Sequence, residues 1–211
     1  MNTPLTLPSV CQQRMAGLLS AGTRQILAII AAPGAGKSTL ASALQAHYGD
    51  AVQVVPMDGF HLANSELDRL GRRSRKGAPD TFDAAGVVNL LQRVKAQKPG
   101  DAVVYAPEFR REIEEAVAGA IGVYASTPLV IVEGNYLLLD DAPWRELRDV
   151  VNEFWFLDVP DALRQARLLA RHMLFGRTEQ QALDWIASTD EPNAVRIAQT
   201  RRYADLCVPW A

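Results

Sequence analysis

The fold of this chain is decided by residues 26–40, which read Ile-Leu-Ala-Ile-Ile-Ala-Ala-Pro-Gly-Ala-Gly-Lys-Ser-Thr-Leu. The first five residues are apolar and typical of a buried strand, and a glycine-rich turn then leads into a helix-forming segment. Such a turn points consecutive backbone N–H groups at one spot, where the positive end of the following helix also attracts an anion. Lys37 would reach the β- and γ-phosphates of a nucleotide, and the Ser38 hydroxyl would bind Mg²⁺. The stretch therefore predicts a phosphate-binding loop, or P-loop.

One position departs from the usual P-loop pattern, which begins with glycine. The register set by Gly36 and Lys37 puts Ala31 at that position. Alanine can replace glycine there only if the backbone φ is negative. An ordinary glycine-rich turn is the alternative, but the strand before it and the helix after it favour a phosphate site.

Composition limits the classes of protein that fit. The 211 residues are 48% hydrophobic and 22% charged, which suits one globular α/β domain. A net charge of −2 gives no general attraction for nucleic acid or for an anionic membrane. Cys11 and Cys207 lack paired spacing, so we expect reduced thiols rather than a disulfide or zinc site. Met1–Ser9 lacks the regions of a secretory signal, and no apolar stretch could span a bilayer, so we expect a cytoplasmic protein.

Apolar runs and capping residues predict strands that alternate with helices. The expected strands are 25–30, 51–56, 102–105, 128–132, 154–159 and 206–208. The expected helices begin near Ser9, Lys37, Asp83, Asp161, Thr178 or Glu179, and Asn193. We expect a polar, basic loop over 64–82 and a short helix or turn over 112–118. Together these elements imply an α/β fold, in which a central parallel sheet of about five strands carries helices on both faces.

Two acidic residues are expected beside the P-loop, because ligands bind beyond the carboxyl ends of the strands in open parallel sheets. Asp58 follows the second strand, where it could accept a proton from a hydroxyl or organise Mg²⁺. The alternative is a turn aspartate before Gly59. Glu133 directly follows Val-Ile-Val, the position of a Walker B acid that holds Mg²⁺ directly or through water. The alternative is a carboxylate that only caps the next segment.

Four segments together resemble a family, the P-loop kinases that include phosphoribulokinase, uridine kinase and bacterial type I pantothenate kinase. These segments are Ala-Pro-Gly-Ala-Gly-Lys-Ser-Thr (32–39), Met-Asp-Gly-Phe-His-Leu (57–62), Arg-Lys-Gly-Ala-Pro-Asp-Thr-Phe-Asp (75–83) and Val-Ile-Val-Glu-Gly-Asn-Tyr-Leu-Leu (130–138). Within this family the chain is most similar to the bacterial branch labelled fructose transport system kinase or nucleoside/nucleotide kinase family protein. The resemblance covers about residues 24–208 and implies a three-layer α/β/α fold of the P-loop NTPase type.

The resemblance implies one kinase domain over residues 1–211. This domain would use ATP and Mg²⁺ to phosphorylate a hydroxyl of a small metabolite, such as a sugar, a nucleoside or a pantothenate-like compound. Asp58 would be the catalytic base, assisted by Lys37 and Arg171, and Ser38 and Glu133 would hold the metal. The residues expected to bind ATP are Pro33, Gly34, Ala35, Gly36, Lys37, Ser38, Thr39, Arg167 and Arg177.

The family's basic lid is similar to a segment over about residues 164–178. Arg164, Arg167 and Arg171 recur at spacings of three and four, which places them on one helix face. A lid would stabilise charge on the transferring phosphoryl group and exclude water. A solvated helix face is the alternative, although Gly176 gives the segment a hinge-like end.

The acceptor would be bound by residues with polar or aromatic side chains. The candidates are His61, Lys76, Phe82, Tyr105, Arg110 and Tyr136. Arg110 stands where relatives often carry aspartate, which suggests a substrate with a carboxylate or a phosphate. Exposure of the basic loop and packing of His61 and the aromatic residues in the core are the alternatives. We expect no nucleic-acid or membrane partner, and related kinases suggest a homodimer.

Two other classes of function stay open at this point: a nucleotide-dependent regulatory ATPase, and a degenerate module that only binds nucleotide. The sequence lacks the Asn/Thr-Lys-x-Asp motif of GTPase switches and the Leu-Ser-Gly-Gly-Gln motif of ABC ATPases. A switch would hydrolyse nucleotide without an acceptor, whereas a kinase would consume ATP in proportion to its phosphorylated product.

Overall fold

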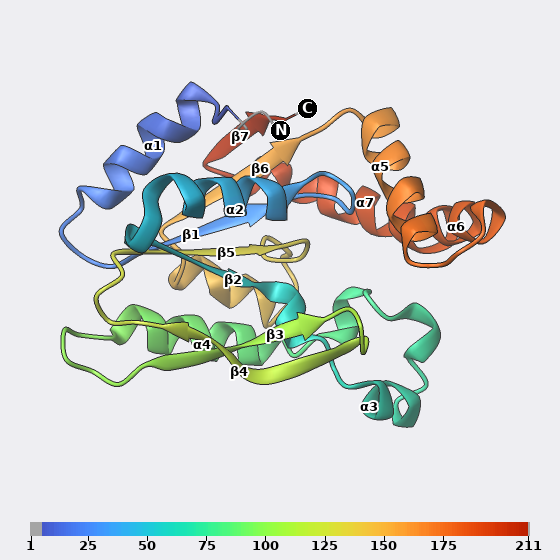
Figure 1. Ribbon diagram of the computed structural model, residues 1–211, viewed down its shortest axis with the longest axis horizontal. Helices are drawn as coiled ribbons and strands as arrows, with labels where there is room; N and C mark the ends of the chain where they lie inside the picture. The colour runs from blue at the N-terminus through green and yellow to red at the C-terminus, as the bar shows by residue number, and fades with distance from the viewer. Residues whose placement is uncertain (1–5, 211) are drawn as a thin grey trace.

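The computed structural model describes residues 6–210 and contains a five-stranded parallel sheet between two layers of helices (Figure 1). The strands of this sheet are β1 (Gln25–Ile30), β2 (Val52–Pro56), β5 (Leu129–Gly134), β6 (Glu153–Asp158) and β7 (Leu206–Pro209). Their order is β2-β5-β1-β6-β7, and every neighbouring pair is parallel. The predicted three-layer fold with five parallel strands is confirmed. The sequence analysis expected no secretory signal in Met1–Ser9, and most of that segment lies outside the described residues.

The central strand β1 explains why helices cover both faces. Ile26, Ala28 and Ile30 belong to one buried core, while Leu27 and Ile29 belong to the other. Successive side chains of a strand point to opposite faces, so a strand that is apolar throughout needs cover on both sides. The helices that supply this cover are α1 (Ser9–Leu19) and α2 (Lys37–Tyr48) on one face, and α4 (Ala84–Ala96) and α7 (Glu191–Ala198) on the other.

Capping side chains are present at two of the predicted helix starts. The Asp83 carboxylate accepts from the Gly86 N–H at 2.8 Å and caps α4. Thr178 caps α6 (Glu179–Trp185) in a capping box with Gln181. Ser9 is the first residue of α1 rather than its cap.

The prediction for residues 102–118 was wrong in part. A strand expected at 102–105 is the longer β3 (Val104–Arg110), and the helix or turn expected at 112–118 lies largely within β4 (Glu115–Val123). These two strands form an antiparallel hairpin outside the main sheet. Most of β4 is small, partly exposed residues without an apolar alternation, so its strand form depends on pairing with β3.

Two further segments differ from the sequence expectations. The expected loop at 64–82 contains the short helix α3 (Asn64–Arg69) and two 3₁₀ turns at 73–75 and 79–81. The single helix expected near 193–203 is α7 followed by a 3₁₀ segment at 199–203. A π-helical turn at 186–190 joins α6 to α7.

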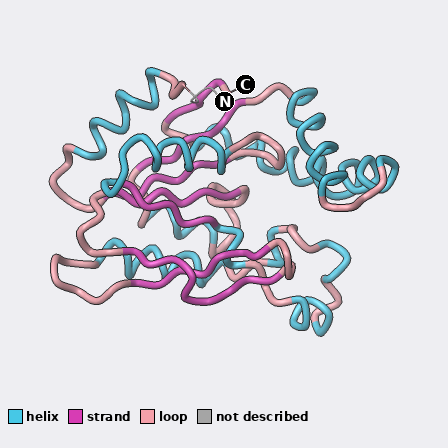
Figure 2. The backbone as a smooth tube through the Cα atoms, viewed as in Figure 1, coloured by secondary structure: helices cyan, strands magenta, loops and turns pink. Residues whose placement is uncertain are grey.

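The carboxyl ends of the sheet strands meet along one edge, between the α5–α6 helices and the tip of the β3–β4 hairpin (Figure 2). Helix α5 (Asp161–Leu174) follows β6 at this edge.

No helix within residues 6–210 is long and apolar enough to cross a membrane. Burial raises the pKa of the Cys11 thiol to about 11.

Candidate functional site

The glycine-rich loop after β1 adopts a conformation that depends on two of its glycines. Gly34 has φ +81° and Gly36 has φ +88°, the left-handed region that side chains disfavour. A Cβ atom on Gly34 would lie 2.6 Å from the Arg164 carbonyl oxygen, and one on Gly36 would lie 2.9 Å from Trp210 Nε1. The loop therefore needs glycine at both positions for backbone conformation and for space.

Ala31, at the departing first position of the loop, is fully buried. Within residues 6–210 the one non-glycine residue with positive φ is Glu114. The backbone at Ala31 is consequently one that alanine adopts without strain, and the missing glycine does not distort the loop.

Three predicted residues meet where the loop enters α2. The Ser38 hydroxyl donates to Glu133 Oε1 at 2.9 Å, and Lys37 Nζ lies 3.9 Å from Glu133 Oε2. Glu133 is the second-last residue of β5, which pairs with β1, and is only 4% exposed. Burial raises the pKa of Glu133, and the charge of Asp58 raises it further, while Lys37 and Ser38 act in the opposite direction. Parallel pairing of β1 and β5 thus delivers the acid to the loop.

The donor set of this group suits Mg²⁺ better than a transition metal. Among the described residues, no group of three or more His, Cys, Asp or Glu side chains is arranged to hold a metal ion. A serine hydroxyl and one carboxylate are hard oxygen donors, and Mg²⁺ commonly takes one or two carboxylates together with phosphate oxygens and waters. Ser38 and Glu133 fit that pattern.

Asp58 lies in a 3₁₀ turn at Met57–Phe60, directly after β2. Its carboxylate is 3.5 Å from Arg111 Nη2 and is near enough to Glu133 to affect the pKa of that residue. The turn is pressed against the hairpin, because a Cβ atom on Gly59 would lie 2.2 Å from the Pro107 carbonyl oxygen. Asp58 is therefore held at the same sheet edge as the loop.

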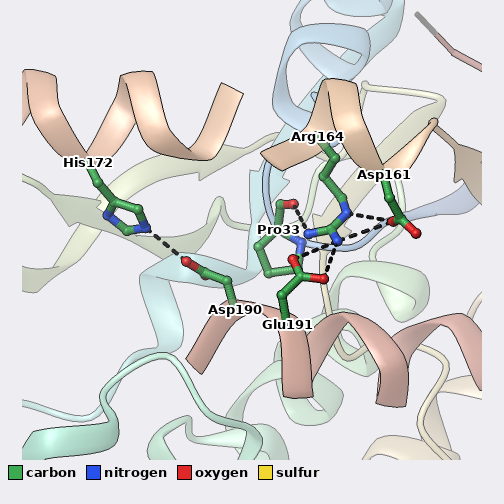
Figure 3. Close-up of polar contacts among 6 residues, drawn as sticks. All are labelled: Pro33, Asp161, Arg164, His172, Asp190 and Glu191. Carbon is green, nitrogen blue, oxygen red and sulfur yellow. Dashed lines mark hydrogen bonds and ion pairs between the residues drawn. The ribbon is translucent and has the colours of Figure 1, made fainter. Parts of the chain in front are cut away.

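Arg164 is buried at the base of the predicted lid (Figure 3). Its guanidinium donates to the Pro33 carbonyl at 3.3 Å and to the two Glu191 carboxylate oxygens at 2.7 and 2.9 Å. It also contacts Asp161 Oδ1 at 3.2 Å. The sequence placed Arg164 on one face with Arg167 and Arg171, but the structure gives it a fixed position between the loop, α5 and α7.

The other predicted lid arginines have different surroundings. Arg167 Nη1 lies 3.8 Å from the place that a Cβ atom on Gly36 would occupy, so it reaches the loop. Burial lowers the pKa of Arg171, and the nearby charge of Arg111 lowers it further, whereas Asp190 and Asp58 act in the opposite direction. These two arginines border the site, and their roles in binding or catalysis stay predictions.

Arg177 is engaged away from the loop. Its Nη1 donates to His172 Nδ1 at 3.1 Å, and its guanidinium carbon lies 4.0 Å from the centre of the Trp185 ring. His172 Nε2 in turn contacts Asp190 Oδ2 at 2.8 Å (Figure 3). Gly176, with φ +90°, ends α5. The structure does not bring Arg177 to the phosphate loop, and its ATP contact stays a prediction.

Three of the six predicted acceptor residues form one aromatic cluster. The His61 ring lies 4.0 Å from the Phe82 ring centre, and Phe82 packs edge-on against Tyr136 at 5.6 Å. The buried Tyr136 hydroxyl donates to the Gly77 carbonyl, and Lys76 Nζ bonds Asn64 Oδ1 at 2.7 Å. Burial lowers the pKa of His61. The cluster fastens the 64–82 segment beside the site, so these residues have a packing role whatever else they do.

Tyr105 and Arg110 stand apart from that cluster. Tyr105 is 59% exposed near the start of β3. Arg110 lies 2.9 Å from Glu108 and 3.9 Å from Glu112. Its neighbour Arg111, which the sequence analysis did not select, is the arginine that faces Asp58. No local signal in the sequence showed that β3 ends at Arg110 and that Arg111 therefore lies in the hairpin turn.

A pocket of about 720 Å³ is lined in part by P-loop residues, and sequence reasoning did not identify it. It is lined by Ala32, Ala35, Pro160, Val195 and Trp210, among other residues. An ion pair of 2.8 Å between Arg201 and Asp158 borders it. The pocket is mainly apolar and opens beside the loop.

These observations define a class of protein. A parallel sheet with a glycine-rich loop after its central strand, and a buried acid from the adjacent strand against the loop serine, is the architecture of a P-loop nucleotide-binding protein. Comparison with known proteins refines this class, although no protein-family model matches the chain.

An uncharacterized protein of Escherichia coli K12, YggC, is 40% identical over 190 residues, which cover 88% of this chain and 77% of YggC. A Schizosaccharomyces pombe protein with the provisional name uridine kinase C227.14 is 35% identical over 182 residues, 81% of this chain and 77% of that protein. The crystal structure of a provisionally named fructose transport system kinase from Silicibacter sp. TM1040 superposes with a TM-score of 0.85 at 40% identity, covering 97% of this chain and 100% of that one.

The chain belongs to the family of P-loop kinases that includes uridine kinase, as the four sequence motifs predicted. It is a small-molecule kinase, a phosphotransferase with a hydroxyl group as acceptor.

Proposed function

We propose that the protein uses ATP and Mg²⁺ to phosphorylate a hydroxyl of a small metabolite: a sugar, a nucleoside or a pantothenate-like compound. The contact of 2.9 Å between the Ser38 hydroxyl and Glu133, with Lys37 Nζ 3.9 Å from the same carboxylate, carries this proposal. It brings a hydroxyl, an acid and a cation together at the mouth of the phosphate loop, the set of groups that phosphoryl transfer from a nucleotide requires.

The reaction divides among the residues of the sheet edge. Asp58 orients the acceptor hydroxyl and takes its proton as the oxygen attacks the γ-phosphorus, while the bond from the γ-phosphorus to the bridging oxygen breaks and ADP leaves. Lys37 and Arg171 balance the negative charge on the transferring group. Mg²⁺, held by Ser38 and Glu133, would neutralise charge on the phosphate oxygens. The protein contributes mostly position and charge, because this reaction needs little covalent help.

The nucleoside part of ATP fits the pocket beside the loop. Ala32 and Ala35 of the loop line this pocket directly, so a nucleotide with its phosphates on the loop extends into it. Its volume of about 720 Å³ lies within the range of about 300–1,000 Å³ of small-molecule sites. Trp210 and Pro160 offer apolar surfaces to a base.

A coupled assay of ATP consumption over a library of hydroxyl metabolites tests the proposal. The names of the relatives, uridine kinase and fructose transport system kinase, make nucleosides and sugars the first compounds to try. Lys37→Ala should abolish transfer, whereas Lys98→Ala, after the carboxyl end of α4, should not. ATP hydrolysis at a rate independent of every acceptor would instead identify a regulatory ATPase. A cytoplasmic location and a homodimer stay predictions.

A further inference from the structure

The guanidinium of Arg111 is held at the acceptor side of the site by groups from three separate elements. Its Nη2 lies 3.5 Å from Asp58 Oδ2 in the turn after β2. Its Cζ lies 5.9 Å from the centre of the Phe109 ring on β3 and 5.8 Å from that of Phe175 at the end of α5. Aromatic faces at this distance attract a guanidinium without using its hydrogen-bond donors. Arg111 is thus oriented while most of its donors stay free.

Asp58 lies among three cations, Arg111, Arg171 and Lys76. Arg111 is near enough to Arg171 to lower the pKa of that residue, so the two guanidinium groups repel each other across the site. Lys76 Nζ lies 4.9 Å from the centre of the same Phe109 ring. Each of the other nearby acids is engaged elsewhere: Glu133 by Lys37 and Ser38, and Asp190 by His172, while Glu114 and Glu115 act on Lys76. An anionic group bound to Arg111 would reduce the repulsion between the two guanidinium groups.

The hydrogen bond between Arg111 and Asp58 is too long to be strong. At 3.5 Å it lies beyond the range of about 2.7–2.9 Å of charge-assisted hydrogen bonds. A carboxylate or a phosphate can accept two parallel N–H bonds from a guanidinium, so it would compete well for Arg111. Its arrival would also leave Asp58 free to accept a proton.

We infer that the acceptor carries an anionic group, a carboxylate or a phosphate, in addition to the hydroxyl that is phosphorylated, and that Arg111 binds this group. The inference rests on the proposed kinase activity and narrows its substrate class. Arg110 is not the binding group, because its side chain faces Glu108 and Glu112.

The test is a coupled ATP assay on matched pairs of acceptors that differ in the anionic group. Suitable pairs are glycerate and glycerol, gluconate and glucose, pantothenate and panthenol, and fructose 6-phosphate and fructose. We expect kcat/KM for the anionic member of the productive pair to exceed that of its neutral partner by about 100-fold or more. The identity of the productive pair tells a carboxylate from a phosphate.

Variants then assign the group to Arg111. Arg111→Gln should raise the KM for the anionic acceptor by about 10- to 100-fold, the loss of roughly 1.4 to 2.8 kcal/mol that one charged contact represents, and should leave the KM for ATP unchanged. Arg111→Lys should recover part of this loss. Arg93→Gln, on the exposed face of α4, is the matched control and should behave as wild type.

Three outcomes would overturn the inference and leave the proposed kinase activity in place. Neutral acceptors could be phosphorylated with the same kcat/KM as anionic ones. Arg111→Gln could lower kcat with an unchanged acceptor KM, which would put Arg111 on the transferring phosphoryl group instead. Arg110→Gln could raise the acceptor KM where Arg111→Gln does not. Absence of ATP-dependent transfer to every acceptor would overturn the proposed function itself, and the inference with it.

Discussion

Arg164 on α5 donates to both carboxylate oxygens of Glu191 on α7, at 2.7 and 2.9 Å, and the same guanidinium bonds the Pro33 carbonyl in the P-loop. The Arg164 side chain is only 3% exposed. A buried guanidinium of this kind fixes the loop, the base of the lid and the last helix relative to one another. Any lid closure would therefore involve the later part of α5 and α6 rather than the first turns of α5.

Removal of one partner from this ion pair should destabilise the protein. Glu191→Gln should lower the free energy of unfolding by about 1.5–3 kcal/mol, because the charged guanidinium would stay buried with a weaker acceptor. Urea denaturation measures this change. The exposed pair Arg196–Asp141 is the control, and Arg196→Gln should change stability by less than about 1 kcal/mol. Equal effects of the two substitutions would contradict the role given to Arg164.

The P-loop should tolerate glycine at Ala31 and reject alanine at Gly34. Gly34→Ala combines a φ of +81° with a Cβ atom 2.7 Å from Leu168 Cγ, so we expect loss of nucleotide binding and a lower melting temperature. Ala31→Gly should keep the ATP affinity within about twofold and reduce stability by about 0.4–1 kcal/mol, through the greater freedom of the unfolded chain. Calorimetric titration with ATP measures the affinity of each variant and so distinguishes Gly34→Ala from Ala31→Gly. Tighter ATP binding by Ala31→Gly would indicate that alanine distorts the loop.

Asp58→Asn should separate catalysis from nucleotide binding. The amide has nearly the shape of the carboxylate but cannot take a proton, so turnover should fall by about 10²- to 10⁴-fold while ATP affinity stays the same. Rapid-quench measurement of phosphoryl transfer checks the expected loss of turnover, and fluorescence titration with ATP checks the unchanged affinity. The control is Asp50→Asn: Asp50 precedes β2, the strand that Asp58 follows, and its substitution should leave both turnover and ATP affinity unchanged. Unchanged turnover in Asp58→Asn would remove this residue from the mechanism.

Glu133 should make the stability of the nucleotide-free protein depend on pH. Its pKa is raised above its ordinary value of 4.5 in the folded state, chiefly by burial, so the folded protein prefers the protonated carboxyl. The stability that this preference contributes is fully present below about pH 4.5 and is lost as the pH rises through the folded-state pKa. Glu133→Gln, which cannot ionise, should gain melting temperature relative to wild type as the pH rises from 4.5 toward 8.

The control for that comparison is the exposed Glu146, whose substitution by glutamine should shift the melting temperature by a similar amount at every pH. A constant difference between Glu133→Gln and wild type would mean that the folded protein does not disfavour the charged carboxylate.

The sheet and the loop were predictable because their signals are local. Residues 26–30 are apolar at every position, which is typical of a strand buried on both faces, and Lys37-Ser38-Thr39 follow at P-loop spacing. Glu133 was predictable for a related reason, since it ends an apolar strand and parallel strands end at the same sheet edge. The hairpin was not predictable in this way. Residues 115–123 lack an apolar alternation and become a strand only through pairing with 104–110.

The roles of the arginines at the site could not be predicted either, because they depend on contacts with residues distant in the sequence. Helical spacing put Arg164, Arg167 and Arg171 on one face, but spacing does not distinguish the buried end of a face from its exposed end. Burial of Arg164 depends on Glu191, 27 positions away in the sequence. Likewise, Arg110 and Arg111 are adjacent in the sequence, but Arg110 is the last residue of β3 and pairs with Glu108, whereas Arg111 begins the hairpin turn and faces Asp58.

The sequence by itself determined the three-layer fold, the phosphate loop and the acid that meets Ser38, because each follows from short-range periodicity or from the rule that parallel strands share an edge. Only the tertiary structure decided which cations surround Asp58, where the pocket beside the loop lies, and which arginine anchors the lid. These features arise from contacts between elements distant in the chain, such as β2 with the β3–β4 hairpin and α5 with α7. The free energy of those contacts depends on how the elements pack together, which a local sequence pattern does not predict.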